Sequence, residues 1–269
     1  MTGAVKELAD ARTVAGFVFV TDESPVYLKA AAVGERVTMP LFKPPWIVVD
    51  HTPERVLVAR WPGRLFRAHV VSPATDEERA AMARAADNLR SDAGYTRAIA
   101  VDLLEEISPS VLFGPQGDAV IRVIEAVIAL DEEGARKLAS ARHPAADREY
   151  SKAWDRWLAE LPKAVHNRNQ DHASTLLIPG AGTSGSPIGH GFAVVWHMLR
   201  KSARLRGRAE SFAVDEDGDE AVLDPWRTAG GALLDAAMAF GAPHLVDSHA
   251  LAVLTRAWNV VFPSLNEAS

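Results

Sequence analysis

The sequence changes its residue pattern near position 73, and this change constrains the fold more than any other feature. Before it, short runs of β-branched and aromatic residues alternate with turn residues, whereas after it the chain is rich in alanine at helical spacing. A series of strands followed by a series of helices indicates an α+β fold. We therefore expect an antiparallel β module at 1–73 and a mostly α-helical domain with an inserted β-hairpin at 74–269.

Six runs in the first part have the composition of strands, and turn residues separate them. One break contains Pro62-Gly63, a pair that suits the central positions of a type II turn. Around Val56 and Val58 the alternation of apolar and polar residues is poor, which indicates that both faces are covered. A small antiparallel barrel or sandwich is the predicted arrangement. The predicted strands span 16–20, 26–33, 36–42, 46–50, 55–61 and 65–71.

Helical patterns dominate the second part. Thr75 and Glu78 match the capping-box pattern, so a helix is expected to begin there. Two short β-type runs, 211–214 and 221–223, flank an acidic segment and predict a β-hairpin within 210–224. The predicted helices span 76–91, 95–107, 118–130, 132–142, 145–161, 190–206, 226–240 and 248–262.

Composition excludes several classes of function. The absence of cysteine excludes disulfides, cysteine-ligated metals and thiol catalysis. With 35 acidic against 29 basic residues and a net charge of −6, the chain lacks the cationic surface that broad nucleic-acid binding requires. No segment has the apolar length of a signal peptide or a membrane span. We therefore expect a cytoplasmic protein that does not associate with membranes.

The segment 172–199 contains no Asp, Glu, Lys or Arg and is the main candidate for a functional site. Within it, a glycine-rich loop at 179–191 leads into an apolar helix that begins near His190. Backbone N–H groups of such loops, and of the helix that follows, bind anions. The alternative is a long surface loop whose glycines only make turns. The residues predicted to bind phosphate or carboxylate are Gly180, Gly182, Thr183, Ser184, Gly185 and Ser186.

Two known signatures resemble parts of this segment. Positions 180–185 satisfy the G-x-G-x-x-G pattern, but Pro179 and Pro187 interrupt the strand and the helix that a dinucleotide-binding fold requires. Pro187-Ile-Gly-His190 resembles the Pro-Ser-Gly-His signature of the phosphatidic acid phosphatase and vanadium haloperoxidase superfamily, in which the histidine acts in phosphate chemistry. Ile188 replaces the serine, and the other segments of that superfamily are missing, so the resemblance assigns no role to His190.

His190 also belongs to two other hypotheses. With His197 it offers imidazole ligands for zinc, iron or manganese, although seven helical residues separate the two by about 10 Å. The alternative is that both histidines are packed and hydrogen-bonded within the protein. With Asp171 and either Ser184 or Ser186 it would form a Ser-His-Asp triad, but the chain has no G-x-S-x-G turn.

The C-terminal end of the same predicted helix is strongly basic, with five cations in 200–208. Arg200 and Arg204 would serve as charge partners of an anionic ligand if the loop lies beside them. In the structural interpretation, these cations stabilise the end of the helix through its dipole. Both interpretations stay open at this point.

No catalytic motif in the sequence is complete. We therefore interpret the chain as a binding or regulatory protein that recognises a protein partner or a small anionic ligand. The alternative is a hydrolase or transferase that acts on a phosphorylated or other anionic substrate, with His190 as acid or base and Arg200 or Arg204 as charge partner. The sequence indicates no cofactor and leaves open whether the chain forms a homo-oligomer.

Overall fold

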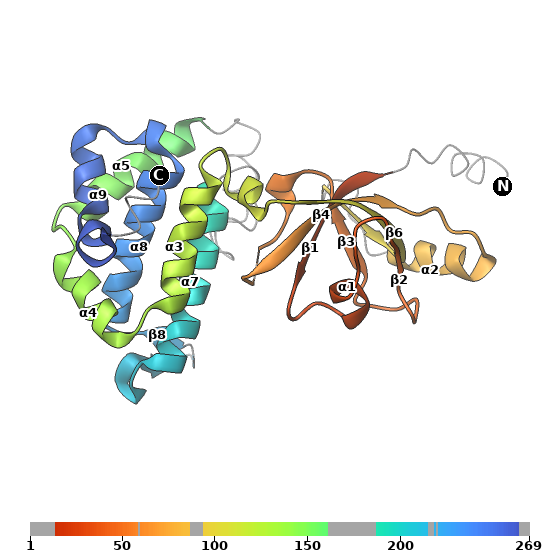
Figure 1. Cartoon of the computed structure of the whole chain (residues 1–269), viewed down its shortest axis with the longest axis horizontal. Coiled ribbons are helices and arrows are strands. Elements are labelled where there is room, and N and C mark those ends of the chain that lie inside the picture. The colour runs from red at the N-terminus through yellow and green to blue at the C-terminus, as the bar shows by residue number, and fades with distance from the viewer. Residues whose placement is uncertain are drawn as a thin grey trace. The chain divides into compact units, whose positions relative to one another are not determined.

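The computed structural model of the chain describes residues 14–58, 60–86, 94–160, 187–214, 218 and 220–263. The chain forms two compact units (Figure 1). The first unit comprises Met1–Leu57 and Pro62–Pro109, and the second comprises Val58–Trp61 and Ser110–Ser269. Strands dominate the described part of the first unit and helices that of the second, so the α+β class is confirmed.

In the described residues, the first unit is built on an antiparallel sheet of six strands in the order β2-β6-β4-β1-β3-β5. The sheet is open, because the edge strands β2 and β5 do not pair with each other. The predicted closed barrel or two-sheet sandwich is therefore wrong. The strands are β1 (Ala15–Thr21), β2 (Arg36–Thr38), β3 (Ile47–Asp50), β4 (Gly63–Val70), β5 (Tyr95–Ala98) and β6 (Ala100–Ile107).

Two helices, α1 (Val26–Lys29) and α2 (Asp76–Ala86), pack against one face of this sheet. Leu28 of α1 and Ala81 of α2 join the buried cluster that contains Val18 and Phe66 from the strands. Burial of these apolar side chains supplies the hydrophobic stabilisation of the unit. The described helices of the unit therefore cover a single face.

The predicted start of α2 is confirmed. Thr75 Oγ1 accepts a hydrogen bond from the backbone N–H of Glu78 at 3.1 Å, and the Glu78 carboxylate accepts one from the N–H of Thr75 at 3.2 Å. This reciprocal pair satisfies donors at the start of the helix that have no partner within it. The last predicted residues of this helix lie outside the described residues.

Three predicted elements of the first unit are wrong. The predicted strand 26–33 begins with α1, which follows Pro25, a residue whose fixed φ suits a helix start. In the predicted strand 55–61, Arg55 ends a short 3-10 helix (Pro53–Arg55) and the other described residues belong to no strand. The predicted helix 95–107 forms β5 and β6, because pairing with β2, β3 and β4 outweighs its helical propensity. These strands extend the first unit to Pro109, beyond the expected boundary near residue 73.

The second unit is a bundle of helices with a small hairpin. Helix α8 is central to it, because α3, α4, α5, α7 and α9 all contact it and most of its residues are buried. The predicted helices and hairpin of this part are confirmed, with ends that differ by a few residues. None of the described helices is both long and apolar enough to cross a bilayer. The elements are α3 (Gly117–Ala129), α4 (Glu132–Ala141), α5 (Ala146–Glu160), α7 (Pro187–Arg206), β7 (Phe212–Val214), β8 (Glu220–Val222), α8 (Trp226–Gly241) and α9 (Ser248–Val261).

Candidate functional site

The predicted anion-binding loop lies outside the described residues. This applies to Gly180, Gly182, Thr183, Ser184, Gly185 and Ser186, and also to Asp171. His190 belongs to the first turn of α7, but its side chain is outside the described part of the structure. The roles proposed for these residues therefore stay predictions.

His197 lies on α7, where it is half-buried and contacts Arg60. Nη1 of Arg60 is 2.6 Å from Nε2 of His197 and 3.4 Å from its Nδ1. Because a guanidinium only donates hydrogen bonds, Nε2 is the acceptor and carries no proton. The described residues contain no group of three His, Asp or Glu side chains arranged to hold a metal ion. The structure thus gives His197 a hydrogen-bonding role within the second unit.

Arg200 and Arg204 lie one turn apart on α7, and both contact Glu220 of β8. Arg200 Nη2 donates to the Glu220 carbonyl oxygen at 2.9 Å and lies 3.6 Å from its carboxylate. The guanidinium of Arg204 forms an ion pair with the same carboxylate. Both arginines therefore connect the helix to the hairpin, and an anionic ligand would have to compete with Glu220 for them.

The rest of the basic end of α7 supports the end of α3. Arg206 donates to the carbonyl oxygens of Ile128 and Leu130, the latter at 3.4 Å. Ser202 Oγ donates to the carbonyl oxygen of Val127 at 2.9 Å. The last carbonyl groups of a helix have no donors within it, so these side chains satisfy them. This geometry supports the structural interpretation of this part of the basic segment.

We expect Glu220→Gln to lower the free energy of unfolding by about 1 kcal/mol or less, because exposed ion pairs contribute little. Its carboxylate is one-third exposed, and Arg204 is more than half exposed. Denaturant unfolding at low and high salt measures the effect, which should shrink as salt screens the charges. A loss that is larger than this and independent of salt would contradict the prediction.

A buried ion pair joins α8 to the segment between α4 and α5. Asp235, which is 2% exposed, accepts hydrogen bonds from Nε of Arg142 at 2.8 Å and from its Nη2 at 3.2 Å. Arg142 also donates to the exposed Asp147 at 2.6 Å. At Gly231, one turn before Asp235, a Cβ atom would lie 2.9 Å from Cζ of Arg142. Glycine at this position therefore lets the guanidinium lie against the helix.

Burial shifts the pKa values of two acidic groups in this cluster. It raises the pKa of Asp235 to about 6, although the hydrogen bonds and charge of Arg142 oppose the rise. Burial also tends to lower the pKa of Arg142, but its bonds to Asp235 and Asp147 outweigh this and hold the pKa above its ordinary value. Burial, together with the charge of Asp235, raises the pKa of the Tyr150 hydroxyl. The cluster is satisfied internally and acts as a connection between helices.

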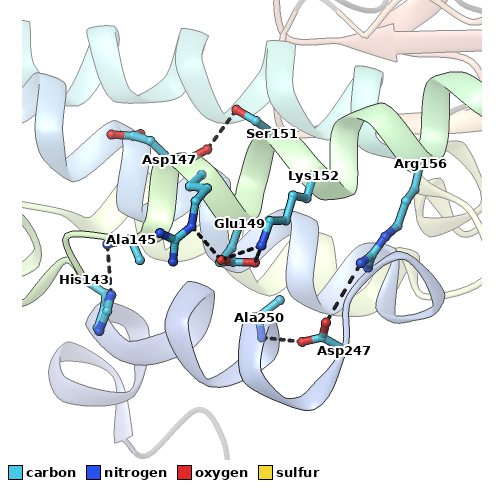
Figure 2. Close-up of polar contacts among 10 residues, drawn as sticks. His143, Ala145, Asp147, Glu149, Ser151, Lys152, Arg156, Asp247 and Ala250 are labelled. Atoms are coloured by element: carbon cyan, nitrogen blue, oxygen red, sulfur yellow. Dashed lines mark hydrogen bonds and ion pairs between the residues drawn. The ribbon is translucent and has the colours of Figure 1, made fainter.

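Polar contacts also connect α5 to α9 (Figure 2). Arg156 Nη2 lies 3.9 Å from the carboxylate of Asp247, which accepts a hydrogen bond from the N–H of Ala250 and so caps α9. On α5 itself, Glu149 accepts hydrogen bonds from Lys152 at 3.0 Å, and these bonds lower its pKa. The charged residues drawn in this view therefore have structural partners within the unit.

The sheet of the first unit has a second face, opposite α1 and α2. The register places Glu105 of β6 beside Arg67 of β4, Arg67 beside Phe17 of β1, Phe17 beside Asp50 of β3, and Asp50 beside Tyr95 of β5. Directly paired residues of antiparallel strands point to the same face. The five side chains therefore form one row across five strands, with Asp50 between two aromatic residues.

A parallel row lies two residues further along each strand. It includes Leu65, Phe19, Val48 and Arg97, of which Val48 is 41% exposed, Phe19 half-buried and Leu65 fully buried. The guanidinium of Arg97 lies 5.9 Å from the centre of the Tyr95 ring, a cation–π distance. We call this surface the open face, and define it as Phe17, Phe19, Val48, Asp50, Tyr95 and Arg97.

Asp50 has the most strongly perturbed chemistry of the open face. Burial raises the pKa of its carboxyl group to about 7, and the positive charge of Arg55 offsets only part of the rise. Perturbed ionisable groups of this kind gather at functional sites. Sequence reasoning missed Asp50, because an aspartate before His51 and Thr52 resembles an ordinary turn residue. Only the strand register shows its position between Phe17 and Tyr95.

Comparison with known proteins adds no relative to this geometry. A scan against protein-family models, a search of curated proteins and a search of solved structures each found no significant match.

Proposed function

We propose that the chain is a binding protein that recognises its partner through the open face of the first unit. The observation that supports this proposal is the position of Asp50, between Phe17 and Tyr95 on adjacent strands. The described helices of the unit pack against the opposite face of the sheet.

The composition of the open face is unlike either ordinary kind of sheet face. A face packed on a core is apolar, and a face directed to water is polar. Here, half-buried aromatic residues surround a carboxylate, and the charged residues Arg97 and Arg67 lie beside them. Aromatic residues and arginine are the residue types enriched at protein interfaces. This mixture supports recognition of another molecule.

In the test, the whole protein is the target on which peptides are selected from a displayed random library. A double variant, Phe17→Ser with Tyr95→Ser, removes both aromatic neighbours of Asp50, and Val260→Ser changes an exposed apolar residue of the second unit as a matched control. We expect the selected peptides to bind the wild type and the control equally, and to bind the double variant at least about tenfold more weakly. Circular dichroism verifies that each variant folds.

Two outcomes of this selection would contradict the proposal. One is that no peptide is selected by the wild type. The other is that the selected peptides bind the folded double variant as tightly as the wild type, which would place their binding site elsewhere on the protein.

The enzymatic alternative has one observation in its favour, the location of His190 in the first turn of α7, directly after the predicted loop. If it is correct, inorganic phosphate or pyrophosphate raises the melting temperature, and His190→Ala reduces that rise. Thermal unfolding with and without these anions measures both effects. A melting temperature that neither anion changes would reject this alternative.

A further inference from the structure

We infer that the partner inserts a cationic side chain, a lysine or an arginine, at Asp50 between Phe17 and Tyr95. This inference rests on the proposed function and specifies the chemistry of the partner. It follows from the strand register around Asp50, from the charge balance of the open face and from the physics of cations near aromatic rings.

The register places three groups of complementary chemistry next to one another. Phe17 and Asp50 are directly paired, and so are Asp50 and Tyr95. Directly opposed residues of antiparallel strands have Cβ atoms about 4.5–5.5 Å apart, so both aromatic side chains are neighbours of the carboxylate. A cation that reaches this position meets a negative charge and the electron-rich faces of aromatic rings, both of which attract it.

Among the described residues, Arg55 acts on Asp50 through its charge, but no side chain donates a hydrogen bond to the Asp50 carboxylate. Arg67 lies 3.7 Å from Glu105, and Arg36 lies 2.7 Å from Asp102, so these arginines have acidic partners. A lysine or arginine of the bound molecule would donate the hydrogen bond that the Asp50 carboxylate does not receive from the described residues.

Because the Asp50 carboxylate is largely buried, its pairing with a cation is energetically favourable. The raised pKa of Asp50 shows that desolvation of its carboxylate outweighs the attraction of Arg55. A cation placed at hydrogen-bonding distance stabilises the ionised form and lowers its pKa. The ionised form of Asp50 is therefore the form that binds, and the affinity for a cation should decrease as the pH falls through about 7.

Other charged groups near Asp50 have to be separated from this effect. Arg55, Arg67 and Arg97 keep their charge across the relevant pH range. His51 follows Asp50 in the chain, and its Nε2 lies 2.8 Å from Oγ1 of Thr96, a residue paired with Val49 of the core. Asp50→Asn keeps the size of the side chain and removes both the negative charge and the titration of residue 50, so it isolates the contribution of the carboxylate.

The experiment is a double-mutant cycle on the full chain with peptides from the selection described above. We expect them to share a lysine or an arginine at one position. Replacing it with norleucine or citrulline, or replacing Asp50 with asparagine, should each weaken binding about tenfold or more. The two changes together should weaken binding little more than either change alone. The wild type should also bind more weakly at about pH 6 than at about pH 8, whereas Asp50→Asn should not.

The outcomes separate this inference from the proposed function. Peptides that need Phe17 and Tyr95 but show no coupling between their cation and Asp50 would overturn the inference and leave the proposed function standing. Failure of every peptide to bind the open face would reject both. Salt-dependent binding of single-stranded RNA to the same aromatic residues would also overturn the inference, since RNA would bring phosphates rather than cations to Asp50.

Discussion

Replacing Asp235 by alanine is expected to lower the free energy of unfolding of the second unit by about 3–5 kcal/mol. Asp235 is 2% exposed, and its partner Arg142 is 18% exposed, so the substitution leaves a largely buried guanidinium without its bidentate acceptor. The loss of a buried partner costs more than the pair itself contributes, because the remaining charge keeps its desolvation penalty. Denaturant unfolding followed by tryptophan fluorescence measures the loss, since six of the seven tryptophans lie in this unit.

Two further variants show whether the unpaired charge is the cause. Asp147 contacts the same guanidinium but is 83% exposed, so Asp147→Ala should cost about 1 kcal/mol or less. The double variant Arg142→Met with Asp235→Leu removes both charges and should recover a large part of the lost stability. An Asp235→Ala loss no greater than that of Asp147→Ala would contradict the buried-pair explanation.

Asp50→Asn is expected to change stability in the opposite direction, with a gain of about 1–3 kcal/mol for the first unit at about pH 8. The folded protein raises the pKa of Asp50 from 3.8 to about 7. Between these values the folded state holds a proton that the unfolded state has released, so wild-type stability falls as the pH rises. The variant has no carboxyl group at residue 50, so its stability does not fall with rising pH for this reason. Its advantage should be absent below about pH 4, grow towards pH 7 and stay constant above it.

Fluorine NMR of protein labelled with fluorotryptophan can follow this unit by itself, because Trp46 is its only tryptophan and packs against its core. Asp102→Asn is a control with the opposite sign. Hydrogen bonds from Arg36 hold the pKa of Asp102 below its ordinary value. Asp102→Asn should therefore be less stable than the wild type near neutral pH, and this difference should shrink as the pH falls. An Asp50→Asn protein no more stable than the wild type at about pH 8 would contradict the prediction.

The gain expected from Asp50→Asn bears on function. A residue that lowers the stability of its own fold is typical of binding and catalytic sites, where function and stability conflict. Loss of binding together with a gain in stability would therefore support the open face as the recognition surface. A gain in stability without any loss of binding would leave Asp50 as a structural feature of the sheet.

The helical part of the fold was predictable because its signals are local. Apolar spacing, the capping pair Thr75 and Glu78, and breaks such as Pro144 each involve neighbouring residues. Asp235 also had a detectable signal, since it is a single charged residue in the apolar part of a helix. Its partner Arg142 lies 93 positions earlier, so the sequence alone could not identify the ion pair.

The sequence by itself determined the α+β class, the helices of the second unit and the small hairpin. Only the tertiary structure decided that the sheet is open, that 95–107 forms two of its strands, and that Asp50 lies between Phe17 and Tyr95. The physical reason is the range of the interactions. A helix forms its hydrogen bonds within a few residues, whereas a strand forms them with partners that are often distant in the sequence, and local patterns do not specify those partners.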